Sequence, residues 1–230
     1  PTYVIVGKGI NFDSGGLQIK GSDGMGSMKG DMTGAGVTLA ILRNAALLKL
    51  PLHVVGLMPC TENMPDGHAY RPGDVLKSMS GQTIEIISSD AEGRLILADA
   101  LTYAGRYQPK AVVDLATLTG ACVTALGTSI AGLLSNNAEL TTALENASAL
   151  SGEKVWELPL EPEYDELLDS DVADMMNVGG RAAEQSLPGC SWRVSPAITP
   201  GRTWISPARN SPAKPTDALS RVVLALACAW

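Results

Sequence analysis

Charged side chains concentrate in three short stretches of this sequence that are rich in glycine or serine. The stretches are GKGINFDSGGLQIK (residues 7–20), SMKGDMTGAG (27–36) and SSDAEGRLILADAL (88–101). Four of the acidic residues in these stretches are Asp13, Asp31, Asp90 and Glu92. Four carboxylates brought together without a counter-ion would raise one another's pKa at a cost of several kcal/mol. Two divalent cations would cancel their charge, and metal pairs about 3.5–4 Å apart recur in hydrolytic sites.

Basic residues in the same stretches fit such a site. Lys8 and Lys20 flank Asp13, and Arg94 follows Glu92 by two positions. A lysine can bind a metal only as a neutral amine, and a nearby dication favours that form by depressing the lysine pKa. Carboxylate oxygens are hard ligands that suit magnesium, manganese or zinc. The spacing and charge of these residues therefore predict a carboxylate metal site.

Each stretch also has a simpler explanation, and the residues alone leave these explanations open. A glycine-rich loop after a strand can be a phosphate cradle or a tight turn, although the GxxxxGK[ST] and GxGxxG spacings are both absent. Asp31 stands where a helix N-cap is expected. Asp90 and Glu92 could lie in a solvated turn with Arg94 as a surface charge, and Lys20 taken alone is expected to be exposed. The two histidines are interpreted as structural.

The elements that must position these residues alternate between strand-like and helix-like patterns. Strands are predicted at YVIVG (3–7), LHVVGLM (52–58), TIEII (83–87), AVVDLAT (111–117) and SIAGLLS (129–135). Helices are predicted over residues 33–50, 94–107, 118–127 and 137–151. Gly36 inside the first helix weakens its helical propensity and suggests close packing there. This order predicts an α/β fold with a mixed, largely parallel sheet sandwiched between helices.

The expected strands end next to the candidate residues. Lys8 and Asp13 follow the strand at 3–7, Asp90 follows the strand at 83–87, and Thr117 closes the strand at 111–117. Ligands of open α/β sheets bind beyond the carboxyl ends of strands. We therefore expect the three stretches to meet at one edge of the sheet.

The overall composition excludes several classes of protein. The 230 residues are 45% hydrophobic, enough for one large core. No apolar run reaches the roughly 18 residues of a membrane span. The net charge of −7 makes nucleic acid an unlikely main partner, because the phosphate backbone would repel it. The chain opens without a signal or transit sequence, and its four widely spaced cysteines suit buried thiols, so a cytoplasmic protein is expected.

These three stretches together resemble the leucyl aminopeptidase family of dimetal peptidases. The family's hallmark is N-T-D-A-E-G-R-L, and this chain has Ser88 and Ser89 in place of the Asn and Thr. The likeness continues through DLATLTGA (114–121) to ADMMNVGGR (173–181) and covers residues 1 to about 181. The resemblance implies a catalytic-domain portion over residues 1–181, with the family's N-terminal domain and the beginning of its catalytic domain absent.

The resemblance also implies roles for individual residues. The implied metal ligands are Lys8, Asp13, Asp31, Asp90 and Glu92, with Asp13 and Glu92 bridging two divalent ions. The implied catalytic residues are Lys20 and Arg94, and the implied substrate-binding residues are Met28, Thr117 and Leu118. The ions would be manganese or zinc, with magnesium or cobalt also compatible, and a bicarbonate ion held by Arg94 would shuttle protons. Peptides with a free N-terminus and a leucine-like first residue would be cleaved by a homohexamer in the cytoplasm.

The last part of the chain departs from this resemblance. Up to Arg181 there are 22 acidic and 12 basic residues, whereas the remainder has 2 and 5. Reading the possible codons of residues 182–230 one nucleotide back allows GGAITAG and W-A-H-L-D-I-A-G-T, which resemble the family's continuation. We therefore hypothesise that the reading frame slips near Arg181, and that the chain with this tail is itself inactive. The alternative is a divergent, proline-rich segment.

Two other functions remain open at this point. One is a non-catalytic relative kept for binding or assembly, although all seven implied ligand and catalytic positions are present. The other is a phosphate- or nucleotide-binding α/β protein, which the glycine-rich loop alone permits.

Overall fold

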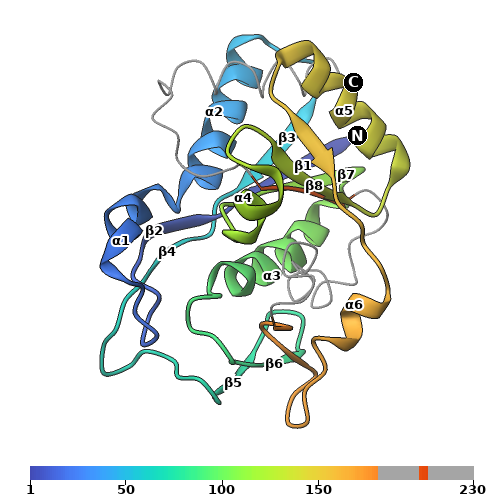
Figure 1. Cartoon of the computed structure of the whole chain (residues 1–230). Coiled ribbons are helices and arrows are strands. Elements are labelled where there is room, and N and C mark those ends of the chain that lie inside the picture. The colour runs from blue at the N-terminus through green and yellow to red at the C-terminus, as the bar shows by residue number, and fades with distance from the viewer. Residues whose placement is uncertain (181–201, 207–230) are drawn as a thin grey trace.

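A six-stranded sheet lies at the centre of the structure, a computed structural model that describes residues 1–180 and 202–206 (Figure 1). In spatial order its strands are β3 (His53–Leu57), β1 (Thr2–Gly7), β7 (Ala111–Leu115), β11 (Arg202–Ser206), β8 (Ala131–Ser135) and β9 (Val155–Glu157). Within this sheet, only the β11–β8 pair is antiparallel, and the other pairs are parallel. The predicted mixed, largely parallel sheet is therefore confirmed.

Helices cover both faces of this sheet (Figure 1). The long ones are α2 (Thr33–Leu47), α3 (Gly93–Ala104) and α5 (Ala138–Ser151), all of which the helical spacing predicts. Side chains of β1 alternate between the faces, so Val4 and Val6 pack with Leu97 of α3. Ile5 points to the other face and packs with Ile41 of α2. This alternation confirms that the sheet is sandwiched between helices.

Two small sheets flank the central one and contribute to the site. One has the order β10 (Met175–Met176), β6 (Thr83–Glu85) and β5 (Val75–Lys77); the other pairs β2 (Gly9–Asp13) with β4 (Cys60–Asn63). The stretch TIEII thus forms a strand, but of a small sheet rather than of the central one. A short apolar run cannot reveal which sheet it joins, because apolar periodicity describes burial and not pairing.

Short helical segments complete the described fold. They are α1 (Ser22–Met25), η1 (Gly26–Gly30), η2 (Gly105–Tyr107), α4 (Ala121–Leu126) and α6 (Glu163–Glu166). Local sequence signals set the bounds of α5: the Asn137 side chain caps its start by accepting a hydrogen bond from the Leu140 N–H at 2.8 Å. Gly152 ends the helix with a φ of 76°.

No helix among residues 1–180 is long and apolar enough to cross a membrane. The expectation of four buried thiols is only partly met, because Cys122 is buried whereas Cys60 is exposed. The other two cysteines, and all of the proposed tail except β11, lie outside the described residues.

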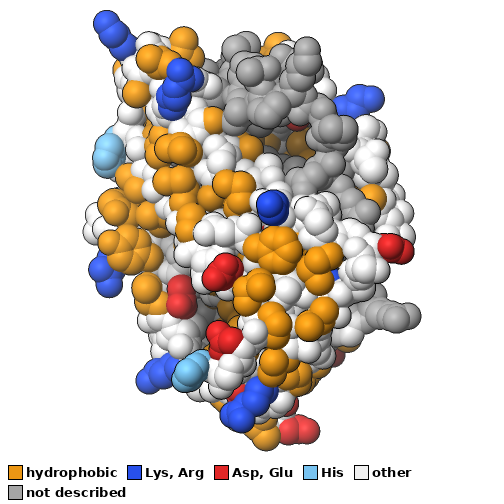
Figure 2. Space-filling view, turned by 90° about the vertical axis from the view of Figure 1, so that its left-hand side faces the viewer, with side chains coloured by type: hydrophobic (Ala, Val, Ile, Leu, Met, Phe, Trp, Pro, Cys, Tyr) orange, Lys and Arg blue, Asp and Glu red, His pale blue; other side chains and the backbone are white. Residues whose placement is uncertain are grey.

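Apolar side chains also reach the surface. Figure 2 shows the side of the molecule that bears α1, α2, β2 and β4, where hydrophobic side chains gather in patches. Ile41 of α2 is buried, but Leu39 and Leu47 of the same helix are exposed to 59% and 64%. Helix α2 thus buries one face against the sheet and leaves apolar side chains on the other.

Two glycines of α2 differ in how closely the surrounding chain approaches them. A Cβ atom on Gly34 would lie 2.0 Å from the Leu115 carbonyl oxygen and 2.8 Å from the Lys8 nitrogen. A Cβ atom on Gly36 would meet only the Met32 Cε, at 3.8 Å. The expectation of close packing at Gly36 is therefore wrong, and the close approach occurs one half-turn earlier, where α2 meets the ends of β1 and β7.

This contrast predicts opposite effects of the same substitution. Gly34→Ala should lower the free energy of unfolding by about 1–3 kcal/mol or more, since backbone atoms cannot yield to the new methyl group. Gly36→Ala should raise it by up to about 1 kcal/mol through helix propensity. Urea unfolding of the two variants measures both effects, and equal destabilisation by both would contradict the packing described here.

Candidate metal centre

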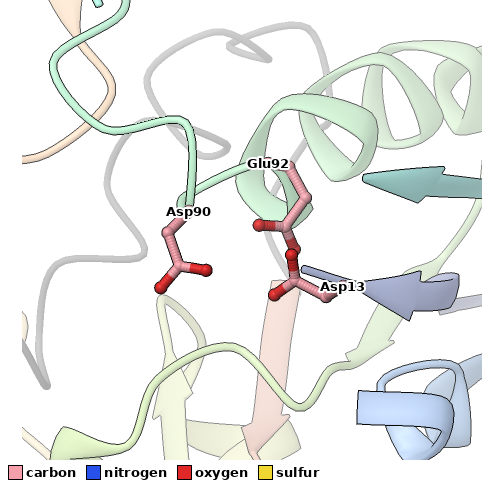
Figure 3. Close-up of side chains that lie close together, drawn as sticks. All are labelled: Asp13, Asp90 and Glu92. Atoms are coloured by element: carbon pink, nitrogen blue, oxygen red, sulfur yellow. The ribbon is translucent and has the colours of Figure 1, made fainter. Parts of the chain in front are cut away.

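Three acidic side chains from two segments that are far apart in the sequence meet beside the central sheet. Asp13 is the last residue of β2, Asp90 lies in the loop before α3, and Glu92 immediately precedes α3. Figure 3 shows their carboxylates turned toward one another, and one oxygen from each lies within 4.8 Å of the other two. Asp13 and Glu92 are buried and Asp90 is exposed. The structure thus brings together the acidic residues of the first and third stretches.

Asp31 joins this cluster through Lys8. The Lys8 Nζ lies 2.7 Å from the Asp31 Oδ2 and 3.0 Å from the Glu92 Oε1, and it donates to the Thr117 carbonyl oxygen at 3.1 Å. Both carboxylates and the ammonium group are buried. The N-cap of α2 is Met32, so the N-cap explanation for Asp31 is wrong. Asp31 instead lies beside the cluster.

Lys20 lies against the other side of the cluster. Its Nζ is 2.8 Å from the Asp13 Oδ2 and also forms an ion pair with Asp90. The Lys20 side chain is only 24% exposed, so the expectation of an exposed lysine is wrong. The solvated-turn explanation also fails for Glu92, which is 5% exposed.

The charges of these groups are strongly coupled. Burial raises the pKa of Asp31 to about 6, although the Lys8 ammonium group opposes the shift. Burial also raises the pKa of Asp90, against hydrogen bonding to Lys20. Burial alone would lower the pKa of Lys8, but the charges of Glu92 and Asp31 outweigh it and raise that pKa.

Lys20 behaves in the same way as Lys8. Burial lowers its pKa, but hydrogen bonds to Asp13 and Asp90 outweigh burial and raise the pKa above its usual value. Both lysines are therefore cationic in this structure and act as counter-ions to the carboxylates. Four carboxylates and two ammonium groups still leave two negative charges, a balance that favours binding of cations.

The backbone around Lys8 is held tightly in place. The Lys8 N–H donates to the Leu115 carbonyl oxygen, and its own carbonyl accepts from the Ala35 N–H, both at 2.9 Å. A Cβ atom on Gly93 would lie 2.4 Å from the Lys8 Cε. The absence of a side chain at position 93 therefore allows Lys8 to pass the start of α3 and reach Asp31 and Glu92.

The glycine-rich loop after β2 uses its amide groups internally. The Gly15 N–H donates to the Asp13 Oδ1 at 2.9 Å, and the Gly16 N–H donates to the Ser14 Oγ at 3.2 Å. Both glycines have positive φ, 89° and 65°. These amides are committed to the protein itself, which argues against the phosphate cradle.

Arg94 lies in the first turn of α3 and is 5% exposed. Its Nη1 donates to the Asn177 carbonyl oxygen at 2.8 Å. The Asn177 side chain accepts from the Ile87 N–H at 2.8 Å and donates to the Ser88 carbonyl oxygen at 2.6 Å. Asn177, which the sequence analysis did not single out, thus fixes both Arg94 and the segment that leads to Asp90.

Of the residues implied to bind substrate, one is in direct contact with the acidic cluster. The Thr117 Oγ1 donates to the Asp31 Oδ1 at 2.7 Å, so Thr117 is in direct contact with the acidic residues. Leu118 packs against the hydrophobic core cluster that includes Leu97 and Leu101 of α3. Met28 is half-buried in η1, three residues before Asp31.

Two further polar residues of the site were missed by the sequence analysis. Asn63, the last residue of β4, donates to the Asp13 Oδ1 at 2.8 Å. The Tyr70 hydroxyl donates to the Ser89 carbonyl oxygen at 3.0 Å, and burial raises the Tyr70 pKa, helped by the charges of Glu92, Asp13 and Asp90. Neither residue lies in the three stretches, and only the folded chain brings them to the cluster.

The donor atoms fit divalent cations. The closely spaced oxygens of Asp13, Asp90 and Glu92 are the hard ligands that manganese, magnesium and zinc accept. Two ammonium groups already lie at hydrogen-bond distance from these and the Asp31 carboxylates. Positive charge is therefore stabilised at the places where ions would bind.

Comparison with known proteins agrees with this geometry. Residues 1–192 match the profile described as "Cytosol aminopeptidase family, catalytic domain". A "Probable cytosol aminopeptidase" of Chlorobaculum tepidum is 58% identical over 183 residues, which are 79% of this chain and 36% of that protein. One of Aliivibrio fischeri is 48% identical over 229 residues, and the match covers 96% of this chain and 46% of that protein.

Solved structures give the same result. "Bottromycin maturation enzyme BotP in complex with Mn" superposes with a TM-score of 0.91 at 37% identity, over 100% of this chain and 54% of that one. The cytosol aminopeptidase of Coxiella burnetii superposes with a TM-score of 0.90 at 36% identity, over 99% of this chain and 52% of that one. This chain thus spans about half or less of the length of these relatives. With a matching family profile over most of its residues and an acidic cluster where the motifs predict one, the chain belongs to the cytosol aminopeptidase family.

Proposed function

We propose that the protein to which this chain belongs is a metal-dependent aminopeptidase that removes the first residue, with a leucine-like preference, from peptides. The observation that carries the proposal is the convergence of Asp13, Asp90 and Glu92, with Asp31 held beside them by Lys8. Membership of the cytosol aminopeptidase family supports it. The related structure BotP, described as a complex with Mn, makes manganese the first metal to test.

Five residues of this chain would hold the two divalent ions: Lys8, Asp13, Asp31, Asp90 and Glu92. When bound, such ions supply a water molecule of lowered pKa and polarise the scissile carbonyl group. Asp13 and Glu92 are the two buried members of the group of three closely spaced carboxylates, and the family resemblance assigns contact with both ions to them. Zinc, magnesium and cobalt are alternatives to manganese.

Two basic residues would act on the reacting groups. Lys20 lies at the open side of the cluster, and its ammonium group would donate a hydrogen bond to the oxyanion that develops at the scissile carbonyl. Arg94 would hold a bicarbonate ion that accepts and returns a proton, a role for which the site offers no histidine. Met28, Thr117 and Leu118 would line the pocket for the first side chain of the substrate.

The assembly and location follow the family by analogy. We propose a homohexamer in the cytoplasm, with peptides that have a free N-terminus as substrates and no nucleic acid partner. The exposed apolar side chains of α2, such as Leu39 and Leu47, suit a chain that is covered by other parts of a larger protein.

The proposed function predicts metal-dependent hydrolysis of leucinamide. The chain as given and a version with the reading frame restored after Arg181 are assayed with manganese, and turnover is expected from the restored version. In that background Lys20→Met should lower kcat about 10²–10³-fold, the usual loss of one oxyanion donor. Lys29→Met, at an exposed position in η1, is the matched control and should leave kcat unchanged. Equal losses in both variants would contradict the role of Lys20.

The charge balance of the site predicts the effect of removing Lys8. Lys8→Met leaves Asp31 and Glu92 buried without their ammonium partner, so in the presence of a chelator the free energy of unfolding should fall by about 3–5 kcal/mol. Lys20→Met should cost less, because its side chain is 24% exposed against 3% for Lys8. Denaturant unfolding of the two variants measures the difference, and a larger loss for Lys20→Met would contradict this account.

The proposed slip of the reading frame has its own test. The family profile ends at residue 192, and the described strand β11 at 202–206 falls where the shifted frame allows A-H-L-D-I. Both observations support the hypothesis. Sequencing the gene around the codon for Arg181 should reveal an insertion or deletion relative to close relatives. An uninterrupted frame that encodes residues 182–230 as given would reject it in favour of a divergent tail.

A further inference from the structure

Asn63 occupies a central place in the acidic cluster although no motif identified in the sequence contains it. It ends β4, directly opposite Asp13 at the end of the neighbouring strand β2. Asn63 is only 6% exposed to solvent. A buried amide of this kind must find hydrogen-bond partners, and its partners are residues of the proposed metal site.

The side-chain nitrogen of Asn63 faces three oxygen acceptors. It lies 2.8 Å from the Asp13 Oδ1, 2.9 Å from the Ser89 carbonyl oxygen and 3.5 Å from the Glu92 Oε2. All three atoms only accept hydrogen bonds when the carboxylates are ionised, so the NH₂ group and not the carbonyl of Asn63 must point toward them. Its two N–H bonds point to the two nearer acceptors, Asp13 and Ser89. The Glu92 oxygen, at 3.5 Å, lies at the outer limit of hydrogen-bond distance from the same nitrogen.

These contacts fix the rotation of the Asp13 carboxylate. The Asp13 Oδ1 accepts from both the Asn63 amide and the Gly15 N–H, which occupy the two lone pairs of that oxygen. The Oδ2 is thereby turned toward Lys20, at 2.8 Å, on the side of the cluster that Asp90 also faces. Asn63 therefore decides which oxygen of Asp13 is presented to a cation.

Asn63 also ties the segment carrying Asp90 and Glu92 to the β2–β4 pair. The Ser89 carbonyl oxygen, which belongs to the peptide bond preceding Asp90, accepts from both Asn63 and the Tyr70 hydroxyl. The backbone carbonyl oxygen of Asn63 accepts from the Ser14 N–H at 2.9 Å and from the Ser14 hydroxyl at 2.7 Å. One residue thus joins three segments that are far apart in the sequence.

We propose that Asn63 is a positioning residue that pre-organises the carboxylates of Asp13 and Glu92 and the Asp90 loop for two divalent ions. The proposal rests on the metal-dependent function proposed above. Carboxylates held this close repel one another, and N–H groups that donate to them favour their ionised form. Hydrogen-bonding partners of metal-binding carboxylates typically contribute about 10–100-fold to metal affinity.

The test is manganese binding by the full chain, measured by calorimetry after treatment with a chelator. Asn63→Ala removes the amide, and we expect its manganese affinity to fall about 10–100-fold with the circular dichroism spectrum unchanged. Asn63→Ser retains one short hydroxyl donor and should lose less. Asn146→Ala, an exposed asparagine of α5, is the matched control and should bind as the parent chain does.

The outcomes separate this inference from the proposed function. If neither the parent chain nor the version with the reading frame restored after Arg181 binds manganese, the metal-dependent function fails. If the parent chain and Asn63→Ala bind manganese with equal affinity, the metal site stands and the positioning role is rejected. If both Asn63 variants remain unfolded in saturating manganese, Asn63 is required for folding rather than for positioning, and the proposal is likewise rejected.

Discussion

The candidate site depends on one constraint: four carboxylates must be held close together in a largely buried place. Like charges at this separation destabilise one another, and burial removes the water that would otherwise screen them. Burial is the main cause of the raised pKa values of Asp31 and Asp90, and the neighbouring carboxylates of Glu92 and Asp13 add to it. Lys8 and Lys20 each bridge two carboxylates and offset part of the repulsion. The two lysines therefore neutralise only part of the negative charge of the four carboxylates.

Rigid contacts of the scaffold keep the charges together. Lys8 cannot withdraw, because its backbone is bonded to β7 and α2 and its side chain passes over Gly93. Gly34 allows α2 to approach the Leu115 carbonyl oxygen, which brings Asp31 to the end of the central sheet. Amide donors from Asn63 and the Gly15 N–H hold Asp13. The repulsion is thus contained by hydrogen bonds and close packing rather than by the lysines alone.

Much of this fold could be predicted from sequence periodicity. Apolar runs such as YVIVG and AVVDLAT became β1 and β7, and the helical spacing located α2, α3 and α5, because those elements bury a regular set of side chains. Strand β2, with the sequence GINFD, was not predicted, since glycine and polar residues interrupt its apolar pattern. The membership of β6 in a small sheet depends on pairing with β5 and β10, and local sequence does not encode such pairing.

The residues of the candidate site, like the elements of the fold, could be predicted only in part from the sequence. Charge and spacing alone indicated the acidic residues, and the resemblance assigned their roles. The sequence could not show that Lys20 faces the cluster, because a lysine in a glycine-rich loop is usually solvated. Asn63 and Asn177 were missed for a related reason. Each acts through hydrogen bonds to residues 26–90 positions away, and a single amide in the sequence carries no sign of its distant partners.

Charge balance also constrains what happens when ions enter. The four carboxylates and two ammonium groups sum to −2, whereas adding two dications would bring the sum to +2. Loss of the Lys8 proton, which a lysine must undergo to bind a metal, would reduce this to +1. The guanidinium group of Arg94 would bring the sum back to +2, an excess that would suit anionic groups such as a developing oxyanion and a bicarbonate ion. Under the proposed function, a site that is too negative without ions would thus become, with two dications bound, electrostatically suited to the negative charge that develops in peptide hydrolysis.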